Sequence, residues 1–307
     1  MREAWLPLAV LLALGLAPLA GFGGAYETTL MARAMILGMA AVALSFLVGG
    51  AGLVSLGHAA SIGVGAYAVA ILDAHGVTEA ALVLPAAVGA ATLFALATGA
   101  IAVRTTGVHF IMITLAFGQM AFFTASSLAA YGGDDGYTLF SRTEAFGTRL
   151  LEDRLAFHYI CLGALALSWA LSAMLLASRF GRVLRAVREN PQRVEAVGLA
   201  PYPFRLVAYG IAGGIGGLAG FLLANATEFV SPATLSWQRS GELLFMVILG
   251  GVGRLWGAIL GALVFVMLET WLAEQMQHWK LVFGPMLVLA VLFLRGGLAG
   301  LVTPRHG

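Results

Sequence analysis

Apolar residues run along the chain in long stretches that are broken by short clusters of charged residues, glycine and proline. A bilayer core about 30 Å thick requires roughly 20 apolar residues for each helical crossing. Such runs, some of them shorter, lie near residues 5–20, 29–48, 53–72, 80–103, 108–130, 157–177, 206–226, 241–253, 255–272 and 281–294. The pattern predicts an all-α polytopic membrane protein with about ten transmembrane or re-entrant helices, and with eight or nine crossings if the short segments re-enter.

Composition supports a lipid environment and narrows the classes of site. Hydrophobic residues make up 60% of the 307 positions and charged residues 10%, whereas soluble domains carry about 25% charged residues. The net charge of +2 is small and the basic residues are dispersed, so nothing favours nucleic-acid binding. Cys161 is the single cysteine, which excludes an internal disulfide and leaves no cysteine-based metal site. We expect one transmembrane domain over residues 1–307, without a metal or cofactor of its own.

Charge placement predicts which loops lie inside. Basic residues concentrate in alternate loops, above all in 179–204, and acidic residues predominate in the others, so both chain ends are expected to be cytoplasmic. Two loops are long: an extracytoplasmic loop at 131–156 and a cytoplasmic loop at 179–204. The opening stretch through Ala20 also fits a secretory signal peptide. With or without its removal, residues 21–27 are expected outside, so the topology of the later spans is the same.

The cytoplasmic loop contains the signals of a short helix outside the bilayer. Asn190 suits the N-cap, Pro191 the first helical position and Gly198 the left-handed residue that follows a helix. Val194 and Val197, three residues apart, are expected to form a small apolar patch for a partner's groove. The simpler alternative is an ordinary basic inner loop that obeys the topology rule.

Several motifs resemble one family of permeases. They are this loop, the segment Tyr202–Tyr209 with the glycine-rich stretch Gly213–Gly220, and the segments Gly52–Ala59, Gly63–Tyr67, Thr105–Phe110, Thr114–Gln119, Phe229–Pro232 and Val247–Gly257. Taken in order, they are similar to the high-affinity branched-chain amino acid permeases of the LivM type.

The resemblance implies a permease subunit of an ATP-binding-cassette importer in the plasma membrane of a prokaryote, moving branched-chain or related small amino acids. It implies a second, LivH-like permease, two cytoplasmic ATPases that bind the ATP, and an extracytoplasmic substrate-binding protein. It also implies that the cytoplasmic loop couples to the ATPases. The residues expected to act there are Arg188, Glu189, Asn190, Pro191, Arg193, Glu195, Ala196 and Gly198.

Other energy sources and activities have less support in the residues. The chain has no Gly-x-x-x-x-Gly-Lys-[Ser/Thr] loop, and its only lysine is Lys280. No midspan acid and base form a pair, so an intramembrane enzyme is not expected and no catalytic residue is assigned. An ion-coupled secondary transporter would rely on His58 as its main midspan ionisable group. A urea or sugar permease of the same architecture is a further alternative.

Small and polar residues within the spans suggest packing and a path. Glycines at spacing four predict close helix contact: Gly210, Gly213, Gly214, Gly216, Gly217 and Gly220. The polar candidates for the transport path, each of which could instead be satisfied by a neighbouring helix, are Ser55, His58, Ser61, Thr114, Gln119 and Asn225. The short run 240–253 predicts a broken or re-entrant helix. Its end, 248–253, echoes 47–52, but both lie on the inner side, which fits an inverted repeat poorly.

Overall fold

The computed structural model describes residues 5–18, 24–144, 147–276, 278–293 and 296–302. Ala20, the predicted end of a cleavable leader, lies outside these residues. The α-helices are α1 (Trp5–Leu16), α2 (Ala25–Phe46), α3 (His58–Ala74), α4 (Ala80–Ala102), α5 (Val108–Ser127), α6 (Arg154–Ala177), α7 (Arg179–Glu189), α8 (Pro191–Ala196), α9 (Pro201–Thr227), α10 (Trp237–Gly250), α11 (Leu255–Gln275), α12 (Trp279–Phe293) and α13 (Gly297–Val302). Short helical turns are η1 (Leu47–Ala51), η2 (Ala129–Tyr131) and η3 (Pro232–Leu235).

Each of the ten predicted apolar runs contains one helix. Six stretches are long and apolar enough to cross a membrane: α2 continued by η1, α4, α5, α6, α9 and α11. The helices α1, α3, α10 and α12 are shorter, at 12, 17, 14 and 15 residues. The protein is therefore a helical polytopic membrane protein, as the hydropathy pattern predicts.

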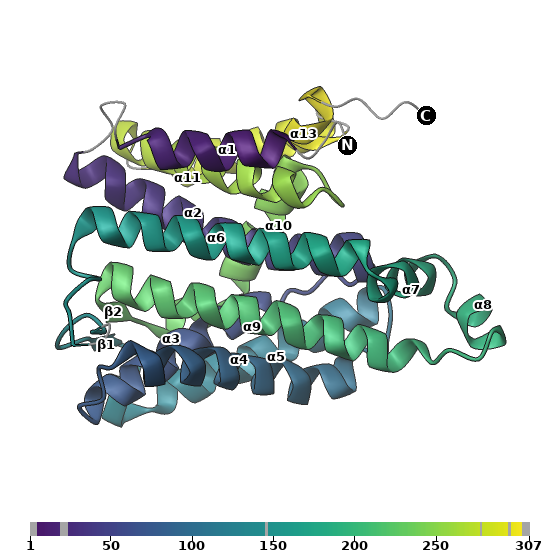
Figure 1. Ribbon diagram of the computed structural model, residues 1–307, viewed down its shortest axis with the longest axis horizontal. Helices are drawn as coiled ribbons and strands as arrows, with labels where there is room; N and C mark the ends of the chain where they lie inside the picture. Colours follow the sequence, from purple (N-terminus) through teal and green to yellow (C-terminus); the bar gives the residue numbers. More distant parts are fainter. Residues whose placement is uncertain (1–4, 19–23, 145–146, 277, 294–295, 303–307) are drawn as a thin grey trace.

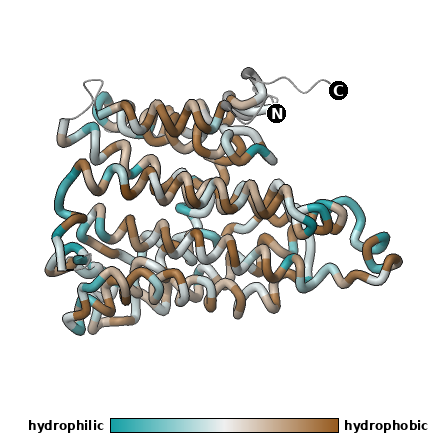
Figure 2. The backbone as a smooth tube through the Cα atoms, in the orientation of Figure 1, coloured by the Kyte–Doolittle hydropathy of each residue, from teal (hydrophilic) through white to brown (hydrophobic). Residues whose placement is uncertain are grey.

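Most long helices lie side by side along one axis, so the bundle has two ends (Figure 1). One end carries α7 and α8, and the other carries a two-residue antiparallel pairing of β1 (Tyr137–Thr138) with β2 (Phe229–Val230). This pairing is a small departure from the all-α expectation. Hydrophilic positions gather at both ends, while the middle is mainly hydrophobic (Figure 2). We refer below to the α7/α8 end and the sheet end.

The first and last described helices, α1 and α13, meet near the α7/α8 end. Leu6 near the start of α1 packs with Trp256 of α11 and Ala299 of α13, and Arg254, just before α11, follows Gly253, which lies against Gly49 beside α7. The end of α1 instead meets the start of α6, where His158 Nε2 lies 3.0 Å from the carbonyl of Leu14. Helix α1 therefore begins at the α7/α8 end and ends at the sheet end.

Two helices begin inside the bundle, after breaks. Helix α2 runs to the α7/α8 end and continues as the π-helical turn η1, where Gly52 adopts a left-handed φ of 69°. The chain then returns without helical structure to His58, where α3 starts. The predicted span beginning at residue 53 is therefore wrong at its start, because the π-turn and the left-handed glycine end the helix there. Helix α10 similarly follows β2 and η3, with Ser236 as its N-cap.

The starts of α3 and α10 lie beside each other and the helices run in opposite directions. The backbone amide of Ala59 donates to Ser240 Oγ at 3.0 Å. Helix α3 leads to the sheet end, where Asp73 accepts a hydrogen bond from Tyr137, whereas α10 leads to Gly251 beside α13. Irregular backbone at this depth survives because protein groups satisfy its hydrogen bonds.

The two broken regions belong to an inverted arrangement. Helices α2, α3 and α4 follow one another with alternating direction, and α9, α10 and α11 do the same with each direction reversed. Helix α4 packs on α9, and α11 packs on α2. The breaks related in this way are 52–57 and 228–236. The similar segments 47–52 and 248–253 are not related to each other by this inverted arrangement. They are in contact instead, at Gly49 and Gly253.

The glycine face of α9 lies against α3 and α4. A methyl group at Gly210 would meet Leu96, and one at Gly214 would meet Thr92. Methyl groups at the other four positions would meet backbone or β-carbon atoms of the neighbouring helices, at Gly213, Gly216, Gly217 and Gly220. Small residues allow helices in lipid to approach closely, so this face holds α9 within the bundle.

Candidate functional site

The segment 179–204 forms two helices rather than the single short one expected. Ser178 Oγ accepts from the amide of Gly181 at 3.5 Å, and Asn190 Oδ1 accepts from the amide of Arg193 at 3.1 Å. Pro191 is the first residue of α8, and Gly198 has a φ of 83°. The caps of α8 are those predicted from the sequence. Helix α7 was missed, although Ser178 is a good N-cap residue.

Helix α7 is fastened to the bundle by its apolar face. Leu184 and Val187 are fully buried, and Gly181 lies directly against the backbone of α6 at Leu176. Phe180 packs near Phe204 of α9, with ring centroids 5.9 Å apart. Because the apolar residues recur at helical spacing, α7 is an amphipathic helix whose position follows the transmembrane helices.

The prediction that Val194 and Val197 form one apolar patch on α8 is wrong. Val194 is buried, with 5% of its surface exposed, whereas Val197 is 74% exposed. Helix α8 ends at Ala196 and Val197 is its C-cap, so helical spacing no longer relates the two side chains. The exposed apolar residues at this tip are Val197 and Leu199.

The residues assigned to coupling lie around that tip. Asn190 and Pro191 are half-buried, and the rest of the set is exposed, namely Arg188, Glu189, Arg193, Glu195, Ala196 and Gly198. The surface of 179–204 therefore combines basic groups with a small apolar tip. Such a surface can bind a soluble partner through both charge and apolar contact.

Arg188 joins this segment to the broken helix α2–η1. Its Nη1 donates to the carbonyl of Gly49 at 2.6 Å, and its side chain covers Gly52. An added Cβ at Gly49 would lie 2.8 Å from Gly253 Cα, after the end of α10. The end of α7, the π-turn and the α10–α11 connection therefore touch one another. A displacement of α7 would act directly on η1, which precedes the break 52–57, and through η1 on the α10–α11 connection.

The polar path candidates on the first break mostly satisfy local backbone. Ser55 Oγ accepts from the amide of Gly57 at 3.3 Å and lies 3.5 Å from the hydroxyl of Tyr209. Thr114 Oγ1 accepts from the amide of Leu56 at 3.3 Å. All of these groups are nearly or fully buried. Ser55 and Thr114 therefore support the irregular segment 52–57, and Ser240, which the sequence analysis did not select, supports the first turn of α3.

His58 differs from its neighbours because one of its two ring nitrogens forms no hydrogen bond with the described residues. The residue is 2% exposed and forms a hydrogen bond with the backbone of Ala40. Within the described part of the chain, its Nε2 has no hydrogen-bond partner. Ser61 is also buried and lies against Gly216 of α9. His58 is thus a polar group at the centre of the bundle whose bonding is incomplete.

The remaining two candidates lie elsewhere. Asn225 is fully buried near the sheet end, where its Oδ1 accepts from the amide of Thr143 at 2.8 Å and its Nδ2 donates to Phe221. Its role is therefore to fasten the loop 131–156 to α9. Gln119 is half-buried on α5. The structure does not bring these two residues together with His58 into one site.

Comparisons with known proteins agree on one family. Residues 27–292 match the family described as branched-chain amino acid transport system / permease component. The LivM high-affinity branched-chain amino acid transport system permease of Salmonella typhimurium is 28% identical over 88% of this chain and 68% of its own, and that of Escherichia coli 27% over the same shares. The probable LivH permease of Methanocaldococcus jannaschii is 30% identical over 39% of this chain and 38% of its own. No solved structure matches the chain.

Proposed function

The chain belongs to the branched-chain amino acid transport permease family, and from that premise we propose that it carries branched-chain amino acids as one permease of an ATP-binding-cassette importer. The match over residues 27–292 supports this proposal most strongly, because it includes both broken regions and the segment 179–204. The protein is a transport subunit, and ATP hydrolysis belongs to separate chains.

The proposed orientation places the α7/α8 end in the cytoplasm of a prokaryote. The arginines of 179–205, together with Arg104 and Arg254, lie at this end. An excess of arginine is typical of cytoplasmic loops. The first and last described helices also begin and end there, so both chain ends are assigned to the cytoplasm. The loop 131–156 then faces outward. The short helices α1, α3, α10 and α12 are assigned to the membrane as transmembrane or re-entrant segments.

Each predicted partner has a surface to which it is assigned. Two cytoplasmic ATPases, which bind the ATP, dock on 179–204 and push on α7. An extracytoplasmic substrate-binding protein delivers its ligand near 131–156. A second, LivH-like permease completes the membrane part, and partial similarity to a LivH protein supports the pairing. In this arrangement nucleotide-driven closure of the ATPases moves α7, and Arg188 transmits the movement to η1.

Reconstitution tests the proposal. The chain is placed in proteoliposomes with its partner permease, its two ATPases and its binding protein, and radiolabelled leucine uptake is measured with ATP or with a non-hydrolysable analogue inside. Uptake that requires hydrolysis is expected, and excess isoleucine or valine should compete with it. Uptake without ATP that collapses with an ionophore would establish an ion-coupled carrier instead. Competition by urea or a sugar, but not by isoleucine, would establish a permease for a neutral solute.

A further inference from the structure

A cavity of about 430 Å³ lies toward the sheet end of the bundle. Its wall comes from α2, α9, η3 and α10, with Ile62 contributed by α3. The volume falls within the range of small-molecule pockets, about 300–1,000 Å³. Because Thr227 and Phe229, which lie at the sheet end, also line it, the cavity is on the side away from α7 and α8.

Charged side chains of both signs line this cavity. Arg239 and Glu242, three residues apart on α10, form an ion pair with an N–O distance of 2.7 Å. Arg33 of α2 also lines it and pairs with Glu269 of α11 at 3.1 Å. The side chains of Arg33, Arg239 and Glu242 are 38%, 42% and 35% exposed. Each can therefore meet a solute in the cavity.

The pairing of Arg33 leaves donors unused. Its Nη2 approaches both carboxylate oxygens of Glu269, at 3.3 and 3.1 Å. Among the described residues, Nε and Nη1 of Arg33 have no hydrogen-bond partner. A guanidinium with two free donor nitrogens can bind a second carboxylate with good geometry. Charged groups within membrane segments are costly and are typically kept for a substrate or ion path.

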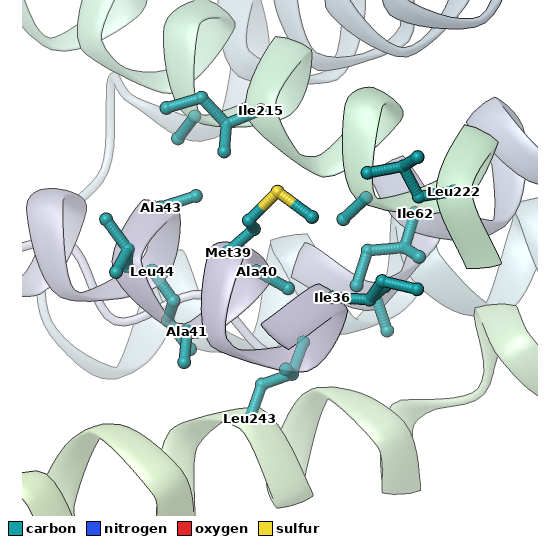
Figure 3. Close-up of a cluster of buried hydrophobic side chains, with 14 of the residues drawn as sticks. Ile36, Met39, Ala40, Ala41, Ala43, Leu44, Ile62, Ile215, Leu222 and Leu243 are labelled. Atoms are coloured by element: carbon teal, nitrogen blue, oxygen red, sulfur yellow. The ribbon is translucent and has the colours of Figure 1, made fainter. Parts of the chain in front are cut away.

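Apart from Thr227, Ser231 and Thr234, the rest of the wall is apolar, and part of it adjoins the packed core. Leu37, Leu223 and Met246 line the cavity beside its charges. Ile62 and Leu243 line it too, and they also belong to the hydrophobic cluster shown in Figure 3. In that view Met39 of α2 lies between the Ile62–Leu222 side and Ile215 of α9. The wall at this point adjoins tightly packed side chains, since Met39 and Leu222 are at most 1% exposed.

From these features we propose that the cavity binds the transported amino acid in its zwitterionic form. The substrate carboxylate bonds to Arg33, its ammonium group bonds to Glu242, and its aliphatic side chain lies against Leu37, Leu223 and Met246. The two ion pairs together carry no net charge, which suits a zwitterion better than an anion or a cation. A solute without ionised groups, such as urea, would gain little binding free energy from these ion pairs. This inference rests on the proposed transport function and adds a site to it.

Cysteine protection tests occupancy directly. The native Cys161 is fully buried, so labelling by a charged thiol reagent should report an introduced cysteine. Ala233, an exposed residue on the cavity wall, is replaced as Ala233→Cys in the assembled importer. Excess leucine is expected to slow its labelling at least fivefold. Gln275→Cys, at an exposed position at the end of α11 and outside both the cavity and the loop 131–156, is the matched control and should label at the same rate with or without leucine.

Removal of the charges tests the assigned contacts. In the Ala233→Cys background, Arg33→Gln and Glu242→Gln should each abolish protection and reduce leucine uptake about tenfold or more. Because Arg33→Gln also leaves Glu269 unpaired, the double variant Arg33→Gln/Glu269→Gln removes that strain and should remain defective. Glu274→Gln removes an α11 carboxylate that accepts a hydrogen bond from Tyr26, at the same end but outside the cavity, and should keep both protection and uptake.

The results separate the site from the function. If the unaltered importer takes up leucine but leucine does not protect Ala233→Cys, and the glutamine variants transport normally, the cavity assignment is wrong and the transport function stands. If the unaltered importer takes up no amino acid, the proposed function itself fails.

Discussion

The contact between η1 and the α10–α11 connection makes one small substitution informative. In Gly49→Ala, the new Cβ would lie 2.8 Å from Gly253 Cα, whereas carbon atoms pack at about 3.5–4.0 Å. The π-turn η1 and the α10–α11 connection must therefore separate by about 1 Å. No side-chain rotation can relieve this contact, since the alanine Cβ is fixed by its own backbone and Gly253 Cα is a backbone atom. Overpacking of this kind costs about 1–3 kcal/mol.

The assay compares this variant with Gly163→Ala on α6, where an added methyl meets nothing within 4 Å. Removing a helical glycine there should stabilise the helix by about 0.5–1 kcal/mol. Thermal unfolding of the purified complex should show a lower midpoint for Gly49→Ala and an unchanged or higher one for Gly163→Ala. Leucine uptake per ATP hydrolysed should fall only in Gly49→Ala. Equal midpoints and equal uptake in the two variants would refute the contact as a mechanical junction.

Three further predictions concern other contacts. Gly65→Ala places a methyl 2.6 Å from a backbone oxygen of α9 and should lower the unfolding midpoint, whereas Gly89→Ala, in open space on α4, should not. Asn225→Ala leaves the buried amide of Thr143 unpaired, at a cost of about 1–3 kcal/mol, and should make the loop 131–156 cleavable by protease added outside. Arg188→Met removes the charged bond to η1 and should leave the ATPases bound while leucine uptake falls severalfold, as copurification and flux assays would show.

Hydropathy and capping residues carried most of the prediction of the fold. Each apolar run holds a helix because burying backbone in lipid requires internal hydrogen bonds. The caps at Asn190 and Gly198 follow from local conformational preferences, and they were predicted to the residue. These features depend on neighbours in sequence, so one chain is enough to find them.

Features that depend on tertiary contact were harder to predict. Residues 53–57 are mostly apolar, so hydropathy alone assigned them to a membrane helix. Two tertiary features define the break: the π-turn before it, and the hydrogen bonds that Ser55 and Thr114 accept from its backbone amides. Val197 was placed on a helix that ends one residue earlier. The sequence analysis did not select Arg33 or Glu242, since nothing local indicates that α2 and α10 bring them to one cavity.

The segment 179–204, at the α7/α8 end, offers the most direct test of the proposed coupling to the ATPases. Residues 191–198 are replaced by a glycine and serine linker of equal length, so that the connection between α7 and α9 is kept while α8 is lost. The account predicts a chain that still inserts and pairs with its partner permease, but fails to retain the ATPases and imports leucine at background level. Leucine import and stimulated ATP hydrolysis at the level of the unaltered complex would contradict it.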